Sequence, residues 1–136
     1  MKKNLSLVAI ATLIVVITLI TLVSCLKIPK NADDAAQVFK DNECEVVVYD
    51  EAQRQAFVDK LWEEDKILIV GLDGYVIATK GDAKAEVFYL QSDADVDSLE
   101  TYYKSDAKDK VTYSSSSTFG GGIVFIGSKE LYNLFK

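Results

Sequence analysis

The side chains that could carry chemistry in this chain are few, and most of them are acidic. The sequence of 136 residues has no histidine, two cysteines, and 21 acidic against 15 basic side chains. Without histidine it lacks the usual general base at neutral pH and the commonest zinc ligand. Its excess of acid disfavours nucleic acid, whose phosphates require a basic surface. The sequence therefore predicts no catalytic residue, no metal site and no cofactor, and it favours binding over catalysis.

Cys44 is the one cysteine beyond residue 25, and its neighbours do not activate it. It stands between Glu43 and Glu45 at the start of an apolar run. Negative neighbours raise the pKa of a thiol, and no histidine is present to take its proton. We interpret Cys44 as a buried structural thiol.

Two groups of acidic residues resemble cation-binding sites. Residues 93–97 (D-A-D-V-D) match the opening of a calcium loop, but the full pattern needs glycine at its sixth position and glutamate at its twelfth. Ser98 and Lys104 occupy those positions. We interpret residues 93–97 as the acidic first turn of a helix, which the helix dipole favours. The second group, residues 63–65 (E-E-D), is interpreted as the solvated end of a helix.

Five residues are the candidate contacts for a ligand or a partner. The segment 114–122 (S-S-S-S-T-F-G-G-G) combines backbone amides that could hold an anion with an aromatic side chain at its tip. Its candidates are Phe119, Gly120 and Gly121. Tyr102 and Tyr103 could line a binding face, although tyrosine is also common in half-buried structural positions.

The first 26 residues differ from the rest of the chain. Lys2 and Lys3 precede an uncharged run from Leu5 to Leu26. A helix of about 20 apolar residues spans the roughly 30 Å of a bilayer core. We therefore expect residues 1–26 to enter a membrane.

The end of this run resembles a processing signal. Leu22-Val23-Ser24-Cys25 is similar to the lipobox of bacterial lipoproteins, in which the cysteine is lipidated and the chain is cut just before it. The resemblance implies that Cys25 carries the lipid and becomes the new N-terminus. The apolar run is longer than that of a cleavable signal, which favours an uncleaved signal anchor instead. Both readings stay open at this point.

Either form of attachment predicts the same location. The two N-terminal lysines favour a cytoplasmic N-terminus, which puts the remainder of the chain on the extracytoplasmic side of the cell membrane. Residues 27–31 would form a short linker, and residues 32–136 a single α+β domain. Because Lys2 and Lys3 are the only charged residues before Cys25, the part from Cys25 onward has 13 basic and 21 acidic side chains.

Apolar spacing and capping residues predict the elements of this domain. Helices are expected from Asn31 to Asp41, over 51–63, and after the caps Ser92 and Ser128. Strands are expected at Cys44–Tyr49, Ile67–Val70, Tyr75–Thr79, Ala85–Leu90, Lys110–Ser114 and Gly122–Ile126. Asp73-Gly74 predicts a hairpin turn, with one long bulged strand as the alternative.

This order of elements predicts a mainly antiparallel sheet with helices on one face. Without its first and last helices, the arrangement is close to the ferredoxin-like β-α-β-β-α-β order. The predicted function is a small, non-catalytic binding or protein-interaction module, attached to the membrane by its N-terminal segment and facing a protein partner in the envelope. The alternatives are a carboxylate-based enzyme acting on cell-envelope material and a structural subunit of a membrane complex.

Overall fold

The computed structural model describes residues 28–104, 111–116 and 121–136, with only the backbone considered for 111–116. The predicted membrane segment, its lipobox cysteine Cys25, and the loop residues Phe119 and Gly120 lie outside the described residues. Within the described ranges, no helix is both long and apolar enough to cross a bilayer.

The described chain forms an α+β fold around one antiparallel sheet, as the sequence predicts. The strand order is β1-β2-β3-β5-β4, and every neighbouring pair is antiparallel. The elements in chain order are α2 (Ala32–Asp41), β1 (Glu45–Val48), α3 (Glu51–Asp65), β2 (Leu72–Lys80), β3 (Ala83–Leu90), α4 (Asp93–Lys104), β4 (Val111–Ser116), β5 (Gly122–Gly127) and α5 (Lys129–Phe135).

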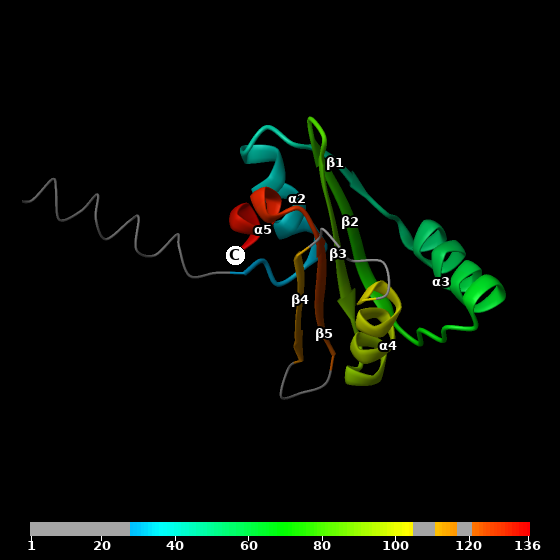
Figure 1. The fold of residues 1–136 in the computed structure, drawn as a ribbon. Helices are drawn as coiled ribbons and strands as arrows, with labels where there is room; N and C mark the ends of the chain where they lie inside the picture. Colours follow the sequence, from blue (N-terminus) through cyan, green and yellow to red (C-terminus); the bar gives the residue numbers. More distant parts are fainter. Residues whose placement is uncertain (1–27, 105–110, 117–120) are drawn as a thin grey trace, which may run out of the picture.

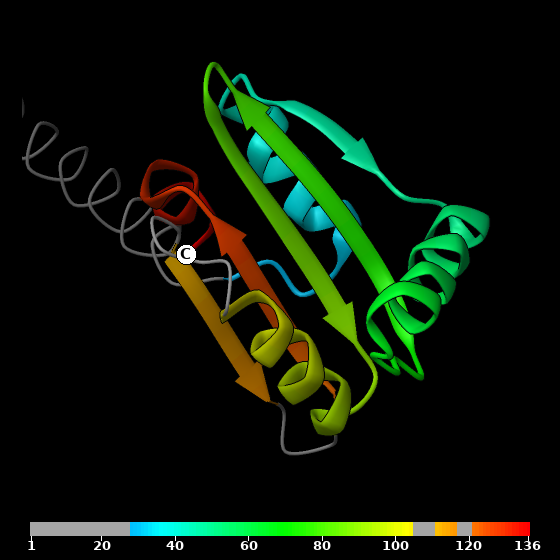
Figure 2. The same cartoon turned by 45° about the vertical axis from the view of Figure 1, so that its right-hand side comes forward.

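The helices cover both faces of the sheet, so the prediction of helices on one face is wrong. Helices α2 and α5 lie on one side of the strands, and α3 and α4 lie on the other (Figures 1 and 2). The cause is that the central strands are apolar on both sides. In β3, for example, Val87 belongs to the same core cluster as Phe39 of α2, whereas Phe88 belongs to the cluster of Leu99 of α4. Two apolar faces each require a covering layer.

The sheet is not ferredoxin-like either. A split β-α-β unit joins two parallel strands through a helix, with another strand between them. Here the strands that flank α3, β1 and β2, are direct antiparallel neighbours, with Val47 opposite Ile77. The strand count and helix order alone could not distinguish these two pairings.

Several helix boundaries follow the local sequence and confirm the prediction. The Asn31 side chain accepts a hydrogen bond from the Asp34 amide at 2.9 Å, and Ser128 accepts one from the Leu131 amide at 3.3 Å. Helix α2 ends at Asp41, with Asn42 as its C-cap, as expected. The apolar spacing of α3 predicts one buried side made of Phe57, Val58, Leu61 and Trp62. Leu61 is buried and Phe57 and Val58 are half-buried, but Trp62 is 50% exposed.

The predictions of a strand and a hairpin turn in the segment between α3 and the middle of β2 are wrong. The predicted strand Ile67–Val70 forms no strand, although Ile69 is buried there. Asp73-Gly74 is not a hairpin turn but lies inside β2, at an irregularity in its pairing with β3. This is the bulged strand named as the alternative. Glycine suits position 74 because a Cβ there would lie 2.8 Å from the Ala32 methyl group.

Candidate functional site

Helix α3 stands at the side of the sheet, and a capping box and the single arginine hold its first turn. Asp50 accepts a hydrogen bond from the Gln53 amide at 2.8 Å, while the Gln53 side chain accepts from the Asp50 amide at 3.0 Å. The Arg54 guanidinium donates to the Tyr49 carbonyl at 2.8 Å and to the Leu72 carbonyl at 3.1 Å. Arg54 therefore joins α3 to the end of β1 and the start of β2, a role that the sequence analysis did not identify.

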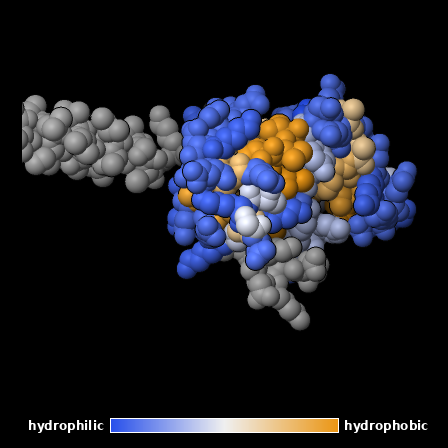
Figure 3. Space-filling view, turned by 90° about the horizontal axis from the view of Figure 1, so that it is seen from above, coloured by the Kyte–Doolittle hydropathy of each residue, from blue (hydrophilic) through white to orange (hydrophobic). Residues whose placement is uncertain are grey.

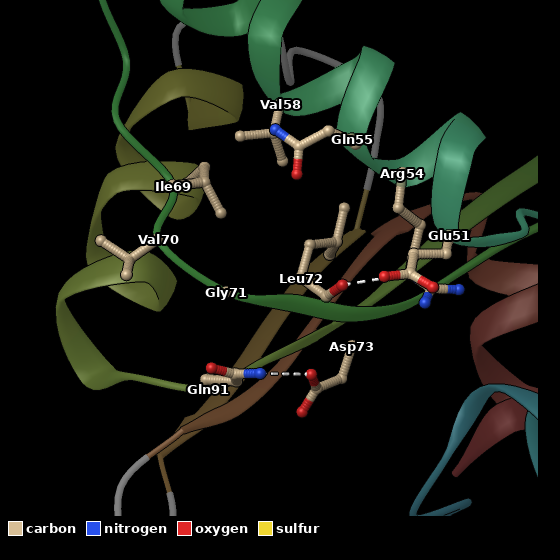
Figure 4. Close-up of a pocket in the computed structure, with 10 residues that line it drawn as sticks. All are labelled: Glu51, Arg54, Gln55, Val58, Ile69, Val70, Gly71, Leu72, Asp73 and Gln91. Atoms are coloured by element: carbon tan, nitrogen blue, oxygen red, sulfur yellow. Dashed lines mark hydrogen bonds between the residues drawn. The ribbon is translucent and has the colours of Figure 1, made fainter.

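A polar cleft lies on one side of α3, between the helix and the segment that leads into β2 (Figure 4). Its volume is about 260 Å³. Its lining combines acidic, amide and guanidinium groups with backbone, from Glu51, Arg54, Gln55, Val58, Ile69, Val70, Gly71, Leu72, Asp73 and Gln91.

The chemistry of this cleft is that of hydrogen bonding. Asp73 accepts a hydrogen bond from the Gln91 amide group at 2.6 Å, and both Asp73 and Glu51 are exposed to water. Arg54 is committed to the two carbonyls named above. Among the described residues, no cluster of three or more cysteine or carboxylate side chains could hold a metal ion.

The other side of α3 is apolar and continues onto β1. A pocket of about 350 Å³ is lined by Tyr49, Gln53, Ala56, Phe57 and Lys60. On the same face of β1 as Tyr49, Val47 is 52% exposed, whereas Val48 is 38% exposed on the opposite face of the strand. We call Val47, Tyr49, Ala56 and Phe57 the β1–α3 surface. Seen from above, hydrophobic surface lies over β1, with weaker hydrophobic surface beside it over α3 (Figure 3).

Strand β1 forms one edge of the described sheet. The Tyr49 amide bonds the Tyr75 carbonyl at 2.9 Å, so Tyr49 faces β2 with its backbone groups. Because backbone groups of successive strand residues point to opposite sides, Val47 also faces β2, and Val46 and Val48 face the open edge. Within the described ranges, the backbone N–H and C=O groups of these two valines have no strand partner.

The two predicted tyrosines belong to a cluster of aromatic rings on the α3–α4 side of the sheet. Tyr102 and Tyr103 pack edge to face, and Tyr103 lies 5.7 Å from Phe88 between ring centroids. The cluster continues through Tyr75, which lies 4.4 Å from both Phe88 and Tyr49. Tyr102 and Tyr103 are half-buried, and Tyr103 is part of this packing.

A carboxylate sits among these rings. The Tyr75 hydroxyl donates a hydrogen bond to Glu86, which is half-buried on β3. Burial, and then the bond to Glu86, raise the pKa of Tyr75 well above its ordinary value. Burial and the charge of Glu86 do the same to the pKa of Tyr103. Both phenols therefore stay protonated at any physiological pH.

Of the loop candidates Phe119, Gly120 and Gly121, only Gly121 lies among the described residues. Its φ angle is +82°, and a Cβ there would lie 2.5 Å from the Leu90 carbonyl oxygen. The glycine lets the start of β5 pass close to the end of β3. Its observed contacts are with the sheet.

The acidic groups of residues 93–97 and 63–65 differ in their surroundings. Asp95 is buried, and its carboxylate accepts hydrogen bonds from the Val70 and Gly71 amides at 2.9 and 3.0 Å. The helix-start interpretation is right for the backbone, since the Asp95 amide donates to the Ser92 hydroxyl at 3.2 Å. At the end of α3, Glu64 lies 3.9 Å from Lys60, and both side chains are well exposed.

Cys44 is buried, as predicted, just before β1. Burial is the main reason that its thiol pKa is raised. Glu130 raises the pKa further, and Lys80 lowers it. The charged group that raises the Cys44 pKa therefore comes from α5. The sequence predicts this effect from Glu43 and Glu45 instead.

We expect Cys44 to react slowly with iodoacetamide in the folded protein, with a pH profile displaced above that of free cysteine. The raised pKa keeps the thiol protonated, and the thiolate is the nucleophile. The favoured thiol form contributes stability below the unfolded-state pKa, and this contribution is lost as pH rises through the folded-state pKa. Alkylation rates of a Cys25→Ala variant, folded and in urea, measure the effect. Equal rates and profiles in both states would contradict it.

Comparison with known proteins gives no relative for this chain. No family model, no curated protein and no solved structure matches it.

Proposed function

We propose that this chain is a small, membrane-anchored extracytoplasmic module that binds a protein partner in the bacterial envelope and performs no catalysis itself. The observation that carries the proposal is the β1–α3 surface. An exposed valine on the edge strand of the described sheet, next to an apolar pocket, forms the kind of surface that partners cover. Trp62 adds a half-exposed aromatic ring on the same helix, and tryptophan is enriched at binding hot spots.

The anchor would hold the domain close to the membrane. Ile28 packs on the core beneath α2 and α5, and the buried Tyr89 hydroxyl donates a hydrogen bond to the Pro29 carbonyl at 2.9 Å. The first described residues are therefore fixed to the domain and leave little free tether. The chain enters the domain on the side opposite α3 (Figure 1), an arrangement that would leave the β1–α3 surface accessible. The attachment itself would be a lipid on Cys25 or an uncleaved helix.

An enzyme that works through carboxylates finds less support. Glu51 and Asp73 share the polar cleft, but both are exposed. A carboxyl group that acts as a general acid needs a water-poor site that keeps it protonated. A structural subunit of a membrane complex is the second candidate, because the same β1–α3 surface would serve a permanent contact.

The test is crosslinking in intact cells, with the full chain expressed from its own membrane segment. We expect one envelope protein to crosslink to wild type and to Val47→Thr, and to be lost from Val47→Lys, which puts a charge into the apolar surface. Partner recovery at a fixed ratio after detergent extraction would favour the structural subunit. If Val47→Lys crosslinks the same proteins as wild type, the surface is not the binding site and the proposal fails.

A further inference from the structure

We infer that the partner binds as an added β-strand: an extended segment with an apolar centre and basic flanks that pairs with the open edge of β1. This inference rests on the proposed function and specifies how the β1–α3 surface is used. Three observations support it, namely the backbone of the edge, its side chains and its charge.

The backbone of β1 offers the pairing groups of an incomplete sheet. The alternation set by the Tyr49–Tyr75 bond directs the N–H and C=O groups of Val46 and Val48 away from β2. An added strand would satisfy these four groups in the way that sheet augmentation does in other peptide-binding domains. The left-handed backbone of Glu43, with φ at +63°, ends the extended stretch on the N-terminal side. The pairing segment is therefore short.

The side chains of this edge favour an apolar strand. Natural edge strands commonly carry lysine, proline or inward-pointing charges that prevent pairing. Here three successive valines occupy positions 46–48, two of them exposed. The pocket of Tyr49, Ala56 and Phe57 follows at the end of the strand. It would receive an apolar side chain from a segment lying along β1, which gives an anchor beyond the backbone bonds.

The charge around the edge selects the flanks of the partner. Glu45 precedes the valines, and Asp50 and Glu51 follow them, all exposed. Two basic groups are also near: the Lys80 ammonium donates to the Asn42 carbonyl at 3.0 Å, and Lys60 lines the pocket. The three carboxylates outnumber them. Lysine or arginine on either side of the apolar centre would therefore meet opposite charge at both ends of β1.

A second copy of this chain fits the same edge less well. Antiparallel pairing of β1 with itself, with Val46 opposite Val48, brings Glu43 of one copy near Glu51 of the other. Two strongly acidic domains would also repel each other. The charge pattern thus favours a basic segment from a different protein.

The test uses the full chain in a non-ionic detergent and a synthetic peptide of about eight residues, the length of an ordinary strand. The peptide alternates valine and threonine and ends in two lysines on each side. We expect it to slow amide hydrogen exchange at Val46 and Val48 by about tenfold or more, while Val47 is already protected by β2. A peptide with glutamates in place of the lysines should bind at least tenfold more weakly. Equal binding of the two peptides would overturn the proposed charge selection.

Two changes isolate the backbone pairing. Val48→Pro removes an outward N–H and leaves the bonds to β2 in place, and edge strands tolerate proline at such positions. Losing this hydrogen bond should weaken peptide binding about tenfold, whereas Val48→Thr should bind as wild type does. Peptides N-methylated on one alternate set of residues should lose binding, and those methylated on the other set should retain it. This comparison needs no change to the protein.

The outcomes separate this inference from the proposed function. Equal binding of both methylated peptides, or peptide protection confined to the polar cleft, overturns strand addition. Protection of Val46 and Val48 that rises with protein concentration alone assigns the edge to a second copy and also overturns it. If the cellular crosslink is lost in Val47→Lys but kept in Val48→Pro, the interaction module stands and strand addition fails. If neither variant changes the crosslinks, the proposed function fails as well.

Discussion

Replacing Asp95 with alanine should lower the free energy of unfolding by about 3 kcal/mol, a large share of the 5–15 kcal/mol that holds a typical domain together. Asp95 is only 2% exposed and accepts hydrogen bonds from the Val70 and Gly71 amides. Alanine would leave these N–H groups without their acceptors, and the Gly71 bond is buried. An unsatisfied buried donor carries its full desolvation cost.

The effect should reach the polar cleft, because the two amides belong to its wall. Val70 and Gly71 line the cleft, and Asp95 attaches their segment to the start of α4. Asp95→Asn keeps one acceptor oxygen and should cost about half as much as alanine. Urea unfolding of the detergent-solubilised chain, followed by circular dichroism, measures the free energy of unfolding of wild type and of the two Asp95 variants.

Asp97 provides the matched control for Asp95. It lies in the same first turns of α4 but is exposed. Asp97→Ala removes only a favourable interaction with the helix dipole and should cost about 0.5 kcal/mol. If the two alanine variants unfold at the same urea concentration, the carboxylate of Asp95 does not hold the segment, and its buried bonds are not important for stability.

The same residue shows what the sequence could and could not predict. Ser92 and the acids after it predict the start of α4, because capping depends on neighbours within one turn. The Ser92 hydroxyl accepts a hydrogen bond from the Asp95 amide, as a cap does. The Asp95 carboxylate turns to amides 24 and 25 residues away, and no local pattern contains that information. Arg54 was missed for the same reason, since its carbonyl partners lie on either side of α3.

Apolar runs were the second source of error. Ile67–Val70 reads as a strand because all four residues are apolar, yet Leu68 and Val70 are exposed and only Ile69 is buried. A short apolar run alone does not show which of its residues are buried, or whether it forms a strand. The sequence singled out Tyr102 and Tyr103, which lie in the aromatic cluster and not on the β1–α3 surface. It did not identify the β1–α3 surface, because exposure of the β1 valines depends on where α3 packs.

Replacing Gly121 with alanine should lower the free energy of unfolding by about 3 kcal/mol, because this glycine serves the fold of the sheet. The expected loss does not depend on a ligand. The left-handed backbone at φ +82° costs an alanine roughly 1–2 kcal/mol. The added Cβ would also lie 2.5 Å from the Leu90 carbonyl oxygen. That atom is backbone of a central strand and cannot move without disturbing the sheet, so overpacking adds a further 1–3 kcal/mol or so.

Gly81 separates these two contributions. It has a similar left-handed φ of +59°, but a Cβ there would meet nothing within 4 Å. Gly81→Ala should therefore cost about 1 kcal/mol, from the backbone alone. The difference between the two variants in urea unfolding gives the cost of the contact with β3. Equal losses would show that β5 can move away from Leu90, and that the contact with β3 does not require glycine at position 121.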